Sequence, residues 1–121
     1  MTRTYMRYVR NRHGNGIGVV AMTFEDGIFG IGTAMCHPTD KFDKKAGKEM
    51  AISRSVKALD GDGMDITDIL SGSWIVDVLD VLPRSAKRQS DVDYMLSAIM
   101  DMIEEDVLVD FARMFARSFA K

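Results

Sequence analysis

The sequence predicts an α+β fold in a single domain over residues 1–121, in which an N-terminal antiparallel β-sheet is followed by two main helices, the C-terminal one long. Residues 2–36 are rich in β-branched and aromatic side chains and are interrupted by Gly- and Asn-rich turns. Apolar residues then recur at helical spacing in two later stretches, the second of which runs almost to the C-terminus. With 46% hydrophobic residues, a chain of 121 residues has enough apolar material for one modest core.

Three N-terminal segments predict the strands of the sheet. They are residues 2–10, Ile17–Phe24 and Ile28–Cys36. The stretch Asn11–Gly16 is rich in turn residues and predicts a loop. Asp26 and Gly27 predict a tight hairpin between the second and third strands, because glycine tolerates a positive φ.

Three glycines lie inside the predicted strands, at Gly18, Gly30 and Gly32. A glycine removes a side chain and lets another backbone, or a flat ligand, approach the sheet closely. Crowded packing is the commoner of these two reasons.

A first helix is expected from Lys41 to Leu59, after Pro38 ends the third strand. Thr39 or Asp40 would cap this helix, and the Asp-Gly repeat at 60–63 would end it. One broad apolar stripe predicts its buried face: Phe42, Ala46, Met50, Ile52, Val56 and Leu59.

The sequence of residues 64–82 does not decide between helix and strand. Trp74–Leu82 fits either a strand, which its Val and Ile residues favour, or a helix that ends at Pro83. We expect the strand.

The last helix is the clearest element of the sequence. Ser90 with Asp93 three residues later resembles a capping box, so we expect the helix to begin there. Apolar residues then follow at helical spacing: Val92, Leu96, Ile99, Ile103, Val107, Phe111, Met114, Phe115 and Phe119.

The length of this helix is itself informative. Residues 90–119 would span about 45 Å at 1.5 Å per residue, whereas a compact chain of this size is about 35 Å across. The overhang would expose Phe111, Phe115 and Phe119, which is costly. We therefore expect the chain to oligomerise or the helix to break near Asp106, and prefer the first.

Composition excludes several classes of protein. The chain has no run of about 20 apolar residues that could cross a bilayer. Its N-terminus carries arginines without a following apolar run, which is not the pattern of a signal peptide. The single cysteine, Cys36, excludes an intrachain disulfide. Adjacent strand residues point to opposite faces, so a catalytic Cys36–His37 couple is unexpected. We expect a soluble, intracellular protein with no catalytic residues, no cofactor and no metal site.

Charge is distributed unevenly along the chain. Residues 1–57 carry a net charge of +5 and residues 58–121 a net charge of −7. The basic half could meet an anion, or the two halves could complement each other within one chain or between subunits. A nucleic-acid-binding protein is one alternative function, and it would use the N-terminal arginines Arg3, Arg7, Arg10 and Arg12 together with the lysines on and around the first helix.

Two basic groups are candidates for binding an anion. The first lies on and around the first helix: Lys41, Lys44, Lys45, Lys48, Arg54 and Lys57. The second is Arg113 with Arg117, four apart on one side of the last helix, where Phe115 could contribute an aromatic ring. A solvated helix face and ion pairs to Asp106 or Asp110 are the respective alternatives. A structural or partner-binding role of the long, Met-rich helix is also open.

The stretch from Phe29 to Leu59 resembles the phage anti-Thoeris sponges, which are small proteins that bind cyclic nucleotides. The matching residues are Ala34, Cys36, Pro38, Asp40, Phe42, Lys44, Lys45, Gly47, Ala51 and Arg54. The pair Arg113 and Arg117 fits the pair of phosphate-binding arginines near the C-terminus of that family. Together these residues cover about a quarter of the chain.

The resemblance implies an oligomer in the cytoplasm of an infected bacterial host. Such a protein sequesters cyclic ADP-ribose-type signals, and in some cases cyclic oligonucleotides, without cleaving them. The implied ligand-binding residues are Arg113, Arg117, Lys44, Lys45, Lys48, Arg54 and Phe115. One departure is Lys48, which stands where the family has arginine and cannot make the same bidentate contact with a phosphate.

Overall fold

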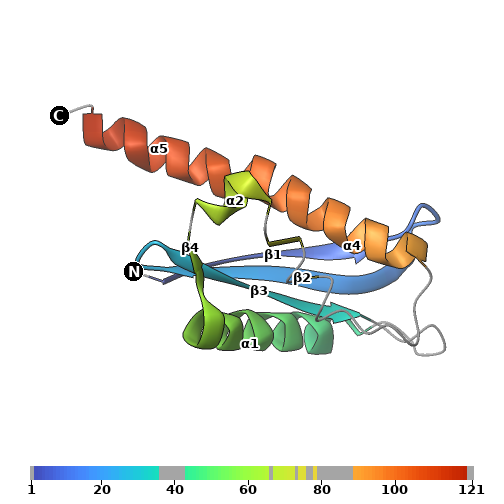
Figure 1. Ribbon diagram of the computed structural model, residues 1–121. Coiled ribbons are helices and arrows are strands. Elements are labelled where there is room, and N and C mark those ends of the chain that lie inside the picture. Colours follow the sequence, from blue (N-terminus) through green and yellow to red (C-terminus); the bar gives the residue numbers. More distant parts are fainter. Residues whose placement is uncertain are drawn as a thin grey trace.

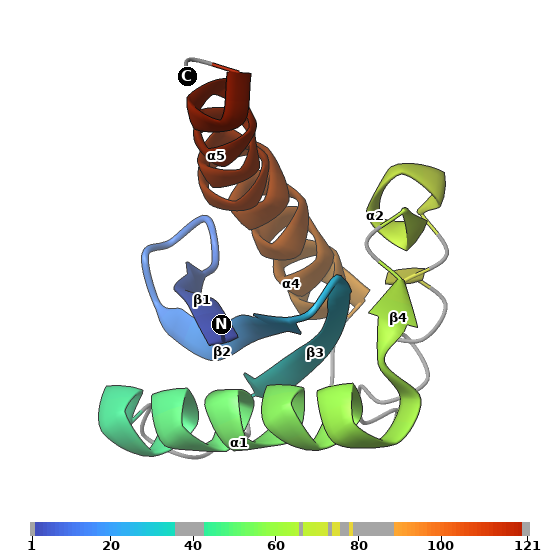
Figure 2. The same ribbon diagram turned by 90° about the vertical axis from the view of Figure 1, so that its left-hand side faces the viewer.

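A four-stranded antiparallel sheet lies between two helical layers in the computed structural model of the protein (Figures 1 and 2). The structure describes residues 2–35, 43–65, 67–72, 74–75, 78 and 89–119. Strands β1 (Thr2–Arg10), β2 (Gly16–Glu25), β3 (Ile28–Met35) and β4 (Met64–Asp65) follow in spatial order β1-β2-β3-β4. The α+β fold expected from the sequence is confirmed.

The hairpin between β2 and β3 has the expected two-residue turn. Glu25 pairs with Ile28, so Asp26 and Gly27 form the loop. Their φ angles are 52° and 84°, as the primed turns that suit twisted hairpins require.

Helix α1 (Lys44–Asp62) covers one face of the sheet. It begins three residues later than expected. Asp43 caps it by accepting a hydrogen bond from the Ala46 amide at 3.1 Å, and the expected caps Thr39 and Asp40 lie outside the described residues.

The apolar stripe expected to bury α1 is wrong at Ala46, Met50 and Val56 but is confirmed at Leu59 and in part at Ile52, and Phe42 lies outside the described residues. Met50 and Val56 are 47% and 39% exposed, and Ala46 is exposed as well. The buried positions are Ala51, Ser55 and Leu59, with Ile52 half-buried. The helix therefore turns its small side chains toward the sheet.

This choice follows from the glycines of β3. A Cβ atom on Gly30 would clash with backbone atoms of Ser55 and Leu59, and one on Gly32 with backbone atoms of Ala51 and Ser55. Because the backbones of α1 and β3 lie this close, only small side chains fit between them. The expectation of crowded packing at Gly30 and Gly32 is confirmed.

Hydroxyl groups satisfy one another inside this tight interface. Thr23 and Ser55 share a buried hydrogen bond of 2.8 Å, and the Ser55 hydroxyl lies 2.7 Å from the Ile52 carbonyl oxygen. The Thr4 hydroxyl lies 3.2 Å from the Thr23 hydroxyl and extends this series of hydrogen bonds.

The opposite face of the sheet carries the large side chains of the core. There α4 (Gln89–Met102), the π-helical segment η1 (Ile103–Val107) and α5 (Leu108–Phe119) form one long helix. Its buried residues pack on the strands: Val9, Val20, Met22, Phe24, Phe29 and Ile31 against Met95, Ile99, Met102, Ile103 and Val107. Ser90 lies inside α4 and so does not precede the helix as a cap.

The connection between α1 and α4 is described in part. Helix α2 (Asp68–Ser71) follows β4, and Trp74, Ile75 and Val78 have helical backbone. The strand expected over Trp74–Leu82 is therefore wrong at these three residues, and the other residues of that stretch lie outside the described part. Trp74 and Val78 are four apart and both buried in the large core.

The glycine contact makes a sharp prediction about stability. Gly32→Ala should lower the free energy of unfolding by about 1–3 kcal/mol, because the added methyl group overpacks the α1–β3 interface. Urea denaturation followed by circular dichroism would measure this loss.

Gly61→Ala is the matched control. Gly61 lies in α1 with no atom within 4 Å of an added Cβ, so its replacement should be neutral or stabilising by up to about 1 kcal/mol. Equal effects at the two glycines would contradict the close approach of α1 to β3.

Candidate functional site

Strand β1 turns three polar side chains toward the long helix. Arg3, Tyr5 and Arg7 alternate along the strand, and alternate residues of a strand share one face. The even-numbered residues face α1 instead, where Met6 packs in the smaller apolar cluster.

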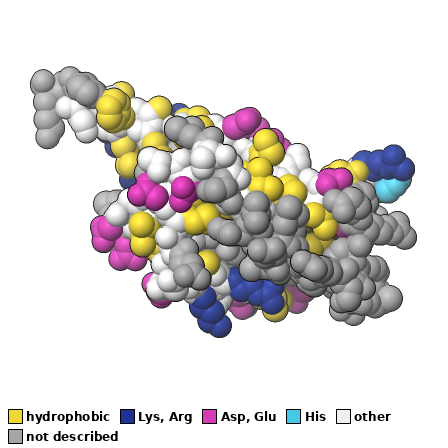
Figure 3. Space-filling view, in the orientation of Figure 1, with side chains coloured by type: hydrophobic (Ala, Val, Ile, Leu, Met, Phe, Trp, Pro, Cys, Tyr) yellow, Lys and Arg dark blue, Asp and Glu magenta, His cyan; other side chains and the backbone are white. Residues whose placement is uncertain are grey.

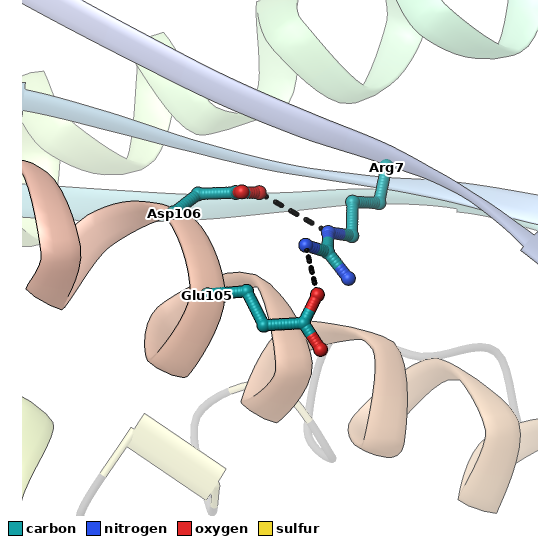
Figure 4. Close-up of polar contacts among 3 residues, drawn as sticks. All are labelled: Arg7, Glu105 and Asp106. Atoms are coloured by element: carbon teal, nitrogen blue, oxygen red, sulfur yellow. Dashed lines mark hydrogen bonds and ion pairs between the residues drawn. The ribbon is translucent and has the colours of Figure 1, made fainter.

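These three side chains meet carboxylates of the long helix. The Arg7 guanidinium donates from Nε to Asp106 at 3.1 Å and from an Nη to Glu105 at 2.8 Å (Figure 4). Asp110 accepts from the Tyr5 hydroxyl at 2.7 Å and from Arg3 at 3.5 Å. We call this set of six residues the β1 clamp.

The π-helical segment places the acidic part of the clamp. Its wider winding is shown by the amide of Leu108, which donates to the carbonyl of Ile103, five residues back. Ile103 and Val107 remain buried while Glu105 and Asp106 reach Arg7. A break near Asp106, which was the alternative to oligomerisation, does not occur: the helix continues, and only its winding changes there.

The clamp pairs some of the unevenly distributed charges of the sequence. Arginines of the basic N-terminal half pair with carboxylates of the acidic C-terminal half inside one chain. The hydrogen bonds that Arg7 donates to Asp106 and Glu105 raise the pKa of its guanidinium, which stays charged. Arg3 and Arg7 therefore form ion pairs within the folded chain. Of the four N-terminal arginines, this leaves Arg10 and Arg12 for contact with a nucleic acid.

Arg113 and Arg117 lie beyond the clamp on α5, and both are exposed. Within the described part of the chain neither forms an ion pair or hydrogen bond. Asp106 and Asp110, which the sequence suggested as their partners, bind β1 instead. The two guanidinium groups therefore remain available to an anion.

Phe115 does not share their side of the helix. It stands two residues from each arginine, and helix residues two apart do not face one another. Its side chain is 66% exposed. On a single α5, a ring stacked on Phe115 and a phosphate bound by the two arginines would therefore lie on different sides of the helix.

The basic group of α1 is held on the other side of the sheet. Lys44, Lys45 and Lys48 are exposed, and the Lys44 ammonium lies 5.5 Å from the centre of the Tyr8 ring. Arg54 donates to the Thr33 carbonyl at 2.7 Å and is thereby tied to β3. Since α1 and the long helix that ends in α5 lie on opposite sides of the sheet (Figure 2), the implied ligand-binding residues form two separate groups in one chain.

Sequence reasoning missed the partners of these basic residues. The contact of Lys44 with Tyr8 has no signal in sequence spacing, because the two residues are far apart along the chain. The clamp has a weak signal in the sequence. Arg3 and Arg7 are four apart on a strand, and Asp106 and Asp110 are four apart on a helix, so each pair lies on one side of its element.

None of the helices within the described part of the chain is both long and apolar enough to span a bilayer.

Removing the Arg7 side of the clamp should loosen the long helix. Arg7→Met leaves Glu105 and Asp106 without their cation, and we expect a loss of about 1 kcal/mol in unfolding free energy that shrinks in high salt. Arg10→Met is the control, because Arg10, among the described residues, donates to the Gly14 carbonyl in the β1–β2 turn and to no carboxylate. A loss for Arg7→Met that high salt does not change would contradict an electrostatic clamp.

Tyr5 gives the clamp a signature at alkaline pH. Burial and the hydrogen bond to Asp110 raise the pKa of its phenol above the ordinary 10.0. Because the folded state favours the neutral phenol, this contribution to stability is complete below pH 10 and is lost as the pH rises through the folded pKa. Ultraviolet titration should show one tyrosine that ionises at a higher pH than the others, and this step should be absent in Tyr5→Phe. If the high-pH part of the titration curve is unchanged in that variant, the assignment to Tyr5 is refuted.

Comparisons with known proteins do not add a relative. No family model matches the chain, and neither a curated protein nor a solved structure does. Part of the motif shared with the anti-Thoeris sponges, at Cys36, Pro38, Asp40 and Phe42, lies outside the described residues. The functional assignment therefore depends on the residues themselves.

Proposed function

We propose that this protein is a non-catalytic binding protein that sequesters a cyclic ADP-ribose-type anion, with a cyclic oligonucleotide as a second possible ligand. The observation that carries the proposal is the pair Arg113 and Arg117, exposed on one side of α5 and free of ion pairs within the described chain. The other arginines with assigned contacts donate to protein groups, as Arg7 and Arg54 do.

The chemistry of two neighbouring guanidinium groups suits a phosphate ligand. Residues four apart on a helix have Cβ atoms about 5–6 Å apart, so both side chains can converge on one pyrophosphate. Each planar guanidinium can give two parallel hydrogen bonds to phosphate oxygens. The nature of the attached nucleoside comes from the resemblance to the anti-Thoeris sponges.

Two features of the structure support a site shared between copies of the chain. Arg113 and Arg117 lie on a part of α5 that projects from the body, where a single chain offers few groups to enclose a ligand (Figure 1). Phe115 points to a different side of the same helix. If the arginines of one copy bind the phosphates, the base could therefore stack only on Phe115 of another copy. The lysines of α1 could likewise reach the ligand only from another copy.

Sequestration needs tight binding and slow release, and no bond of the ligand has to break. An anion-binding surface of arginines is sufficient for this task. The proposal therefore assigns no general acid, general base or nucleophile to the chain.

Calorimetric titration with isomers of cyclic ADP-ribose tests the proposal. Arg113→Ala should weaken binding about 10- to 100-fold, the loss expected when a hydrogen-bonded charge pair is removed. Arg113→Lys should recover only part of that loss, because an ammonium group cannot make the bidentate contact.

Arg12→Ala is the charge-matched control. Arg12 lies in the turn between β1 and β2, where basic side chains gather at the end of the molecule far from α5 (Figure 3). Its replacement should leave the affinity unchanged. Lack of heat at micromolar protein, or equal weakening by both alanine variants, would rule out the arginine pair as the ligand site.

A further inference from the structure

Arg3 is the arginine that the β1 clamp holds more weakly. Its Nη1 atom lies 3.5 Å from Oδ2 of Asp110, whereas Arg7 donates to its two carboxylates at 2.8 and 3.1 Å. Hydrogen bonds between a guanidinium and a carboxylate are usually about 2.7–2.9 Å long. The Arg3 and Asp110 side chains are 37% and 34% exposed, and ion pairs with this much exposure contribute little to stability. Arg3 can therefore leave Asp110 at small cost.

Asp110 keeps a strong hydrogen bond without Arg3. It accepts from the Tyr5 hydroxyl at 2.7 Å. The Tyr5 ring packs edge-to-face on the ring of Phe24, with centroids 5.7 Å apart, and this contact holds the phenol in place. When Arg3 turns away, the Asp110 carboxylate thus remains bound to the sheet, and its half-exposed oxygens are solvated by water.

Packing keeps Arg3 close to the beginning of α5. Arg3 and Phe24 are direct partners in the β1–β2 ladder, so their side chains share one face of the sheet. The ring of Phe111, in the first turn of α5, lies edge-to-face on Phe24 with centroids 5.3 Å apart. The N-terminal end of β1 and the root of the projecting α5 consequently lie at the same end of the molecule (Figure 1).

The α5 arginines continue the side of the helix that carries Asp110. Arg113 and Arg117 follow Asp110 by three and seven residues, close to one and two helical turns. Residues three apart on a helix have Cβ atoms about 5–6 Å apart. The Arg3 guanidinium, which contacts Asp110, is therefore about one turn from Arg113 and on the same side of the helix.

We infer that Arg3 is a third cation of the anion site and exchanges Asp110 for the ligand when Arg113 and Arg117 bind it. This inference rests on the proposed function and adds a residue to its site. In the free chain Arg3 is paired with Asp110, and in the complex it donates to phosphate oxygens beside Arg113. Asp110 offsets one of the two positive charges on α5, and Arg3 restores the charge that a doubly charged pyrophosphate linkage requires.

Calorimetric titration with cyclic ADP-ribose isomers gives the first test. Arg3→Met should weaken binding about 3- to 10-fold, less than Arg113→Ala, because Arg3 must first leave Asp110. Arg10→Met is the matched control, since Arg10 lies at the other end of the same strand and donates to the Gly14 carbonyl. Its affinity should be that of the wild type. Equal affinities of the two folded variants, checked by circular dichroism, would overturn the inference.

Asp110→Asn should change the affinity in the opposite direction. Asparagine keeps an oxygen acceptor for Tyr5 but no charge that holds Arg3 or repels the ligand, so binding should tighten about 2- to 5-fold. Asp101→Asn is the control, because it removes an exposed carboxylate about 18 Å from Arg113 along the helix, beyond the screening length. If Asp110 were only a structural group, its replacement would leave binding unchanged or weaker, and that result would contradict the exchange.

The double variant separates exchange from simple repulsion. If Arg3 moves from Asp110 to the ligand, the gain from Asp110→Asn should be smaller in an Arg3→Met background, where no arginine is released. If Arg3 only neutralises Asp110 in place, the gain should be larger in that background, because the carboxylate is then unscreened. A larger gain would therefore overturn the inference.

Nuclear magnetic resonance of the arginine side chains distinguishes this inference from the proposed function. In titrations with inorganic pyrophosphate and with cyclic ADP-ribose isomers, the ¹⁵Nε signals of Arg3, Arg113 and Arg117 should shift together. The signal of Arg7, which two carboxylates hold, should stay in place. Shifts of Arg113 and Arg117 without Arg3 would refute the inference and leave the proposed function intact. If neither ligand shifts any of the three signals, both are refuted.

Discussion

The contact of the α1 backbone with Gly30 and Gly32 is the constraint on which the architecture rests. It fixes α1 against β3 with small side chains between them, so this face of the sheet buries mainly Ala, Val, Ser and Thr. The large side chains of β2 and β3 must then point to the other face, where the long helix buries them. The sheet is consequently covered on both faces, and the basic group of α1 is kept apart from the arginines of α5.

The β1 clamp fixes how the long helix is rotated about its own axis on that second face. Apolar packing alone would tolerate some rotation of the helix, because Met, Ile and Val can repack. Hydrogen bonds from Arg7 and Tyr5 to Asp106 and Asp110 restrict it, because they require particular carboxylates to face β1. Arg113 and Arg117 follow Asp106 and Asp110 by seven residues each, about two helical turns, so they continue the same side of the helix farther along α5, where both are exposed.

Local signals in the sequence predicted much of this fold. The Asp26-Gly27 turn, the three long strands and the last helix each follow from residue types whose backbone or spacing preferences are strong. The buried face of α1 was misjudged because burial there is decided by the glycines of a different element, so Met50 and Val56 are exposed while Ser55 is buried. Trp74–Leu82 was misjudged because its apolar residues suit both periodicities, and the core selects the helical one at Trp74 and Val78.

The candidate site was predictable in part. Spacing alone places Arg113 and Arg117 together on one side of a helix. It did not reveal that Asp106 and Asp110 are taken by β1, because that depends on a contact between residues about a hundred positions apart. The separation of α1 from α5 likewise depends on which face each helix covers.

The π-helical winding at Ile103–Val107 has a consequence for how this chain can vary. A π turn accommodates one more residue than an α turn in nearly the same length of helix. Losing a single residue within it would restore ordinary winding while leaving both flanking segments in phase, with Ile99 and Phe111 still toward the sheet. Natural length differences in this helix should therefore be tolerated best at that turn, and a one-residue deletion elsewhere in α4 or α5 should rotate one end of the helix out of register with the other.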